Sequence, residues 1–144
     1  MYINKINITN FKKIEHIELN FNKGFNLIIG DNSSGKTSVL EAISVALGGF
    51  LAGIDSISTI HFNSDEIRRV NSWIGDGSYN TKFLTPIMVE CDLTLGDESY
   101  SFTRKKVSVK SSRTTIEPRD ICKAATILAN DDDSPLPIIS YQSA

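Results

Sequence analysis

The sequence predicts an α/β fold with a central sheet and an antiparallel β subregion. A short apolar run at residues 25–29 leads through a glycine-containing loop into a segment with apolar residues at helical spacing. Apolar and polar residues alternate at residues 2–9, 17–21 and 87–95, which is typical of half-buried strands. The chain has 144 residues, 40% of them hydrophobic and 22% charged, so it suits one domain or one lobe of a larger domain.

The N-terminal third is expected to contain a strand pair, a buried strand and a helix, in that order. Residues 2–9 and 17–21 predict an antiparallel pair, and Asn22-Lys23-Gly24 predicts a turn after it. The nearly continuous apolar run Phe25–Ile29 predicts a central strand buried on both faces. The helix after the loop is expected to stop at Gly48-Gly49.

The remainder of the chain shows weaker patterns over residues 50–84 and clearer ones afterwards. We expect Trp73, Tyr79 and Phe83 to pack beneath this middle segment. The expected elements are a short helix at residues 65–70 capped by Ser64, a loop at 76–78, a hairpin of 87–95 with the return strand around 100–102, an edge strand at 106–110, an amphipathic helix from Pro118 to about Asn130, and a last strand at Leu136–Tyr141.

Composition excludes several classes of protein. The formal net charge is −2, so the chain has no overall basic surface for nucleic acid. Cys91 and Cys122 lack metal-ligand spacing and are expected to be reduced, partly buried thiols. No stretch resembles a signal peptide or reaches transmembrane length, so we expect a cytoplasmic protein with no membrane partner.

The loop at residues 30–37 carries the complete pattern G-x-x-x-x-G-K-[ST]. Gly30 and Gly35 permit backbone conformations and close approaches that a side chain would obstruct. Backbone N–H groups at the start of the next helix can then surround phosphate oxygens. Lys36 would reach the β- and γ-phosphates, and Thr37 would offer its hydroxyl to Mg²⁺. The alternative is a glycine-rich turn with an incidental lysine. The pattern predicts a P-loop NTPase lobe with a helix after the phosphate loop.

The loop alone does not choose among kinases, GTPases and motor-like ATPases. The chain contains neither the Asn-Lys-x-Asp nor the Asp-x-x-Gly pattern that a GTPase needs. A small-molecule kinase usually places this loop after a single strand, whereas here an antiparallel pair precedes it. This layout favours another group of ATPases.

Residues 3–47, INKINITNFKKIEHIELNFNKGFNLIIGDNSSGKTSVLEAISVAL, resemble the opening of the ABC-type ATPase head of SMC, RecF and related proteins. The residues that fit this family pattern are Asn10-Phe11, Gly24, Asn32 and Glu41-Ala42-Ile43. The resemblance implies that residues 1–144 are the N-terminal lobe of such a head and a fragment of a longer chain.

The resemblance also implies roles for individual residues. Thr37 would ligate Mg²⁺ and Ser38 would lie near the α-phosphate. Lys12 or Lys13 would approach the nucleotide, although a solvated hairpin tip is the favoured interpretation of both lysines. Gln142 would link Mg²⁺ and the attacking water, and an ordinary polar strand end is its alternative. The loop residues expected to surround the phosphates are Gly30, Asn32, Ser33, Ser34, Gly35 and Lys36.

A narrower resemblance concerns residues 135–144, PLPIISYQSA. This segment is similar to one in ATPases encoded beside nucleases in bacterial phage defence. Those proteins usually have Tyr where Gln142 stands, which argues against a catalytic role for Gln142.

Two motifs of a hydrolytic site are missing from the sequence. A Walker B site needs an apolar strand that ends in Asp-Glu, and the nearest candidate, ILANDDD at residues 127–133, reads as a solvated loop. The Leu-Ser-Gly-Gly-like signature that would contact a partner's nucleotide is also absent. We therefore expect the full-length protein to be an ATPase and this fragment alone to be inactive.

The expected function is binding of ATP and Mg²⁺ that promotes dimerisation of two heads. Hydrolysis in the full-length protein would drive a DNA transaction such as repair or chromosome maintenance, or would gate a partner nuclease in phage defence. The alternatives are a nucleotide sensor without hydrolysis and, less favoured, a small-metabolite kinase. The basic segment at residues 104–113 is read as protection of an edge strand rather than as a DNA contact.

Overall fold

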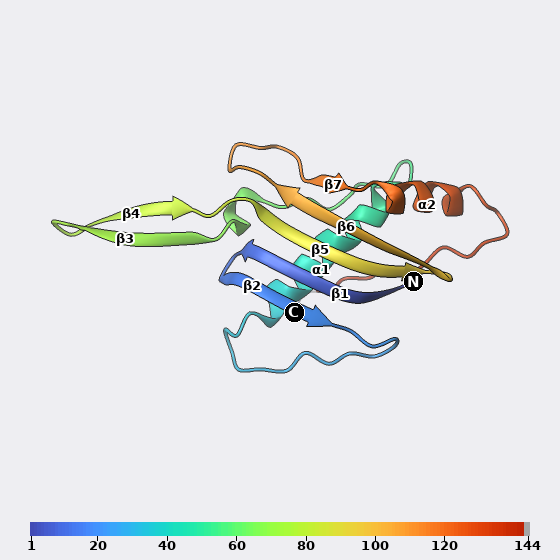
Figure 1. Cartoon of the computed structure of the whole chain (residues 1–144), viewed down its shortest axis with the longest axis horizontal. Coiled ribbons are helices and arrows are strands. Elements are labelled where there is room, and N and C mark those ends of the chain that lie inside the picture. The colour runs from blue at the N-terminus through green and yellow to red at the C-terminus, as the bar shows by residue number, and fades with distance from the viewer. Residues whose placement is uncertain (143–144) are drawn as a thin grey trace.

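A five-stranded antiparallel sheet organises the chain, in the order β2-β1-β5-β6-β7 (Figure 1). The structure, a computed structural model, describes residues 1–142. The predicted α/β class is confirmed, because two α-helices accompany this sheet. The strands are β1 (Tyr2–Phe11), β2 (Ile14–Asn20), β5 (Ile87–Leu95), β6 (Glu98–Lys106) and β7 (Thr115–Glu117).

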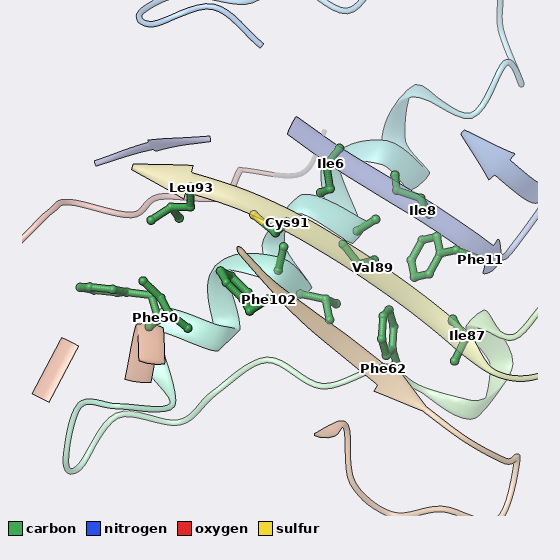
Figure 2. Close-up of a cluster of buried hydrophobic side chains, with 14 of the residues drawn as sticks. Ile6, Ile8, Phe11, Phe50, Phe62, Ile87, Val89, Cys91, Leu93 and Phe102 are labelled. Atoms are coloured by element: carbon green, nitrogen blue, oxygen red, sulfur yellow. The ribbon is translucent and has the colours of Figure 1, made fainter. Parts of the chain in front are cut away.

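The helices cover one face of this sheet. The helix α1 (Lys36–Leu51) crosses behind the strands in Figure 1, and α2 (Asp120–Ala129) lies near its C-terminal end. Figure 2 shows the side chains between these layers. They include cross-strand pairs in which Ile6 lies opposite Cys91 and Ile8 lies opposite Val89, and all four are buried. Removing such apolar side chains from water is the main stabilising contribution to the fold.

Two glycines inside α1 allow close packing, Gly49 against the sheet and Gly48 against the segment that follows the helix. The helix continues through Gly48 and Gly49, so the prediction that it stops there was wrong. A Cβ on Gly49 would lie 2.7 Å from a ring carbon of Phe102, and one on Gly48 would lie 2.9 Å from the carbonyl oxygen of Ile60. These glycines are needed for packing rather than for a helix end.

The prediction of a buried central strand at Phe25–Ile29 was also wrong. These residues form no strand, and Phe25, Leu27 and Ile29 are 88%, 71% and 81% exposed. A strand requires a neighbour for its backbone hydrogen bonds, and none of the described residues supplies one here. The side chain of Asn26 instead closes a turn, donating to the carbonyl oxygens of Asn22 (2.8 Å) and Gly24.

Two further predicted strands do not form. Residues 136–141 have no strand partner among the described residues, and Ile138 is 95% exposed. The expected edge strand at residues 106–110 was wrong because β6 ends at Lys106. The edge of the sheet is the short strand β7 instead.

The middle of the chain contains a hairpin that the sequence pattern did not predict. The 3₁₀ helix η1 (Ser64–Glu66) replaces the expected helix at residues 65–70, and Asn63 rather than Ser64 caps it. The strands β3 (Arg69–Gly75) and β4 (Ser78–Phe83) follow and project away from the sheet in Figure 1. Trp73 and Tyr79 are 60% and 65% exposed and contact each other, with ring centroids 5.2 Å apart, so they do not pack beneath the middle segment as expected.

Several sequence predictions are confirmed. The strand pair β1–β2, the hairpin β5–β6 and the helix α2 lie close to the predicted residues. Cys91 and Cys122 are free and buried, and burial raises the pKa of the Cys91 thiol to about 12. Among the residues described, no helix is long and apolar enough to cross a membrane.

The core assignment can be tested with two phenylalanines. Phe102→Ala should lower the free energy of unfolding by about 3–5 kcal/mol, because this ring is 3% exposed and its loss leaves a cavity beneath α1. Phe25→Ala removes the same atoms from an exposed ring and should change it by less than about 0.5 kcal/mol. Urea unfolding measures both values, and equal losses would contradict the position of Phe25 outside the core.

Candidate functional site: a phosphate-binding loop

The loop at residues 30–37 lies at the N-terminus of α1. Gly35 is the N-cap residue of this helix, with φ of +94°, and Ser33 also has a positive φ of +69°. The amide of Val39 donates to the carbonyl oxygen of Gly35 (2.9 Å). The amides of Lys36, Thr37 and Ser38 precede this first helical hydrogen bond and therefore have no partner within the helix.

The start of α1 is suited to an anion. No side chain caps the helix, and its first turn contains no acidic residue. The unpaired amides and the helix dipole place positive partial charge at this end. The predicted role of the loop backbone therefore agrees with its local geometry.

Lys36 folds back over the loop. Its Nζ donates to the carbonyl oxygens of Gly30 (2.7 Å) and Asp31 (2.6 Å) and lies 3.5 Å from Oγ of Ser34. A Cβ on Gly30 would lie 2.8 Å from that hydroxyl oxygen, so a side chain there would disturb the loop. The ammonium is thus held beside the helix N-terminus by neutral oxygen acceptors and carries an uncompensated positive charge.

A cavity of about 370 Å³ opens beside the loop. The turn between β1 and β2 contributes Lys12 and Lys13 to its wall, and a contact of either lysine with a nucleotide remains a prediction. Gly30 and Gln142 do not line this cavity, and the role of Gln142 remains a prediction. The other lining residues are Asn32, Ser33, Ser34, Gly35, Lys36, Thr37 and Ser38.

The two lysines of the β-turn differ in their surroundings. The Nζ of Lys12 forms an ion pair with Glu41 of α1 and lies 3.9 Å from a carboxylate oxygen of Glu66. Its charge is thereby offset, and the contact connects the turn to the helix. Lys13 is exposed and makes no ion pair among residues 1–142, so its charge is available to a ligand.

Sequence reasoning missed Glu41 and Glu66 as part of this site. Glu41 lies four residues after Thr37, so helical periodicity places both on one face of α1. No sequence signal indicated Glu66. Burial raises the pKa of the Glu66 carboxyl, and this effect outweighs both its hydrogen bond from the Asn63 amide (2.8 Å) and the attraction of Lys12.

The loop fits the triphosphate and Mg²⁺ that the sequence implies. Free amides and the Lys36 ammonium are suitable partners for phosphate oxygens. Within the described part of the chain, no group of three or more His, Cys, Asp or Glu side chains could hold a metal ion. Thr37 is exposed and offers a hydroxyl, which suits Mg²⁺ because this ion is bound largely through phosphate oxygens and water.

The basic segment at residues 104–113 does not form a stripe on the surface. Arg104 and Lys106 are 1% and 4% exposed and point into the protein from β6. Lys105 faces the other way and pairs with Glu117 at 3.0 Å. The reading of this segment as an edge strand fails, because β7 covers that side of β6.

Comparison with known protein families identifies a match over most of the chain. The model of a family described as an AAA domain matches residues 5–137. The DNA replication and repair protein RecF of Nitrosococcus oceani is 44% identical over 71 residues, which are 49% of this chain and 20% of the relative. RecF of Geobacter sulfurreducens is 51% identical over 43 residues, 30% of this chain and 12% of the relative. The chain thus spans a fifth or less of the length of these relatives.

A solved structure supports the same fold. It comes from work described as "Structural biochemistry of ATP-driven dimerization and DNA stimulated activation of SMC ATPases". It aligns with a TM-score of 0.55 and 24% sequence identity over 88% of this chain and 80% of that chain. The predicted fold, the lobe of a P-loop NTPase, is confirmed.

The raised pKa of Glu66 predicts a pH effect on stability. The folded state holds this proton more tightly than the unfolded chain, so the contribution of Glu66 to stability falls as pH rises above its ordinary value of 4.5. Glu66→Gln keeps an acceptor for the Asn63 amide but removes the titration. The difference in free energy of unfolding, wild type minus variant, should therefore decrease as pH rises from about 4 to 7. Urea unfolding across that range measures it, and parallel profiles would contradict the assignment.

Proposed function

The chain belongs to the AAA domain family, and from this membership we propose that residues 1–144 are the N-terminal lobe of a RecF- or SMC-like ATPase head that binds ATP and Mg²⁺. The observation that carries this proposal is the loop itself. Unpaired amides at the start of α1 and the Lys36 ammonium face one cavity, where no side chain caps the helix. These groups suit the oxygens of a triphosphate better than those of a neutral ligand.

Each residue of the site has a role in this proposal. The amides from Asn32 to Lys36 surround the phosphates, and Ser38 lies toward the α-phosphate. Lys36 exchanges its carbonyl partners for phosphate oxygens and offsets charge at the γ-phosphate, while the Thr37 hydroxyl ligates Mg²⁺. Lys13 is the better candidate of the two turn lysines, because Lys12 is already paired with Glu41. When bound, Mg²⁺ would neutralise phosphate charge.

We assign the second half of the head to sequence outside this lobe. Residues 25–29 and 136–141 include exposed apolar side chains. The backbone of these two segments has no strand partner among the described residues. Such segments gain both hydrogen bonds and burial when a further sheet pairs with them. Gln142 directly follows the second of these segments, so its proposed contact with Mg²⁺ and the attacking water depends on that assembly.

The proposed reaction of the complete protein is ATP hydrolysis coupled to dimerisation of two heads and to DNA repair or chromosome maintenance in the cytoplasm. The similarity to RecF proteins, which act in DNA replication and repair, and to an SMC ATPase structure supports this choice, as does the family. Gating of a partner nuclease in phage defence is supported only by the resemblance of residues 135–144. The Asp-Glu pair that follows a strand, Asp97-Glu98, lies in the turn of the β5–β6 hairpin and does not line the cavity beside the loop. We therefore expect this chain alone to bind ATP without hydrolysing it. A nucleotide sensor is the second candidate for the same reason.

Thermal unfolding with nucleotides tests the proposal. ATP and Mg²⁺ at about 100 times the dissociation constant should stabilise the chain by about 2.7 kcal/mol, which raises Tm by several degrees. Lys36→Ala should abolish the rise. GTP should give a smaller rise if the site is selective for ATP.

The matched control is Lys23→Ala, which removes an exposed lysine outside the cavity. This variant should keep the full stabilisation by ATP. A Tm that does not respond to any nucleotide, or an ATP response that survives Lys36→Ala, would contradict binding at this loop.

A further inference from the structure

Arg104 is a buried cation without an anionic partner. It lies on β6 and is 1% exposed, and burial lowers its pKa to about 10, so it is charged at neutral pH. Its guanidinium donates to Thr59 Oγ1 (3.3 Å) and to the carbonyl oxygen of Ile60 (2.6 Å), and its buried Nε has no partner. Only two of its five N–H donors are therefore used. No carboxylate forms an ion pair with it among residues 1–142.

Arg104 lines a cavity of about 380 Å³ together with two further arginines and a histidine. The segment after α1 provides one wall with Thr59 and His61, and the stretch around β7 provides the other with Arg113 and Arg119. These two segments run side by side in Figure 1, and the Phe62 amide donates to Thr114 Oγ1 (2.8 Å) between them. The fold therefore holds the two walls of this cavity together.

The charges around this cavity are strongly unbalanced. Arg113 and Arg119 are exposed and form no ion pair within the described chain. The carboxylate among the lining residues is Glu117, and Lys105 already occupies it at 3.0 Å. The pKa of the His61 imidazole is lowered, first by burial and then by the nearby positive charges of Arg104 and Arg113.

This cavity is separate from the phosphate-binding loop. The two cavities share no lining residue. The loop lies at the N-terminus of α1, and Ala52, which lines the basic cavity, follows the C-terminus. The helix has 16 residues and is therefore about 24 Å long, so one ligand phosphate cannot contact both ends.

We propose that the cavity around Arg104, Arg113 and Arg119 is a second anion site that binds the phosphate group of a phosphate monoester. Guanidinium groups match phosphate oxygens in paired hydrogen bonds. A dianionic phosphate also balances three positive charges better than a single carboxylate does. The volume lies within the range of small-ligand pockets, which leaves room for part of the molecule that carries the phosphate. The source is a free phosphorylated metabolite or the terminal phosphate of a nucleic-acid strand. This site goes beyond the proposed ATP site and does not depend on it.

A purely structural role for Arg104 explains only part of these observations. Its bonds to Thr59 and Ile60 hold the segment after α1 against β6. They do not explain the remaining N–H donors, nor why Arg113 and Arg119 gather at the same cavity without carboxylates. The experiment therefore alters the exposed arginines and observes the buried one.

The test uses the chain with Lys36→Ala, so that the phosphate-binding loop does not contribute. Inorganic phosphate is titrated at constant ionic strength, with sodium chloride as the balancing salt, and the Nε–H resonance of Arg104 is followed by NMR. We expect this resonance to move with saturation. Adding Arg113→Ala and Arg119→Ala together should weaken the apparent affinity at least tenfold. The matched pair Lys23→Ala and Lys123→Ala, which removes two lysines outside the cavity, should leave it unchanged.

Two results would overturn the proposal. One is an Arg104 resonance that does not move with phosphate, or that moves equally with chloride. The other is an affinity that survives loss of both exposed arginines in a variant whose thermal unfolding shows it to be folded. Because every arm carries Lys36→Ala, failure here leaves the ATP proposal untouched.

Two further ligands identify the source of the phosphate. A phosphorylated sugar is compared with a short single-stranded oligonucleotide that carries either a 5′-phosphate or a 5′-hydroxyl. Tighter binding of the 5′-phosphorylated strand assigns the end of a nucleic acid, whereas equal or tighter binding of the sugar assigns a free metabolite. Equal binding of both oligonucleotides, with no effect of the sugar, would overturn recognition of a phosphate monoester.

Discussion

The packing of α1 against the buried face of β1, β5 and β6 places the two ends of this helix at the two cavities. The contact is close because Gly49 has no side chain where it meets the Phe102 ring. The core between these layers fixes the axis of the helix, and the ion pair of Lys12 with Glu41 joins its first half to the β1–β2 turn. The helix N-terminus therefore faces the turn lysines across one cavity, and its C-terminal end leads into the wall of the basic cavity.

Hydrogen bonds within the loop hold Lys36 beside the start of α1. Lys36 uses the carbonyl oxygens of Gly30 and Asp31 as acceptors, which keeps the ammonium over the loop. In the proposed complex, a phosphate would replace these hydrogen bonds and give the ammonium a charged partner. Because the folded chain already orders Lys36, less conformational entropy would be lost when a phosphate binds.

The sequence was informative where a local pattern decides the structure. Alternation predicted β1, β2 and the hairpin β5–β6, and the loop pattern predicted the helix that begins at Lys36. The predictions failed where the structure depends on residues that are distant in the sequence. Phe25–Ile29 is apolar enough for a buried strand, yet the described residues give it no neighbour. Gly48-Gly49 resembles a helix stop, although these residues serve close packing. Nothing in the spacing of residues showed that Glu66 would lie beside Lys12, or that Arg104 would be buried without a carboxylate.

The most direct test of the central claim, a preorganised phosphate site at the N-terminus of α1, is an NMR titration of the wild-type chain with ATP and Mg²⁺ that follows backbone amides. The account predicts that the amides of Lys36, Thr37 and Ser38 shift together and saturate, while those of β3 and β4 stay in place. Saturating shifts that avoid the start of α1, or an absence of shifts at any ATP concentration, would contradict it.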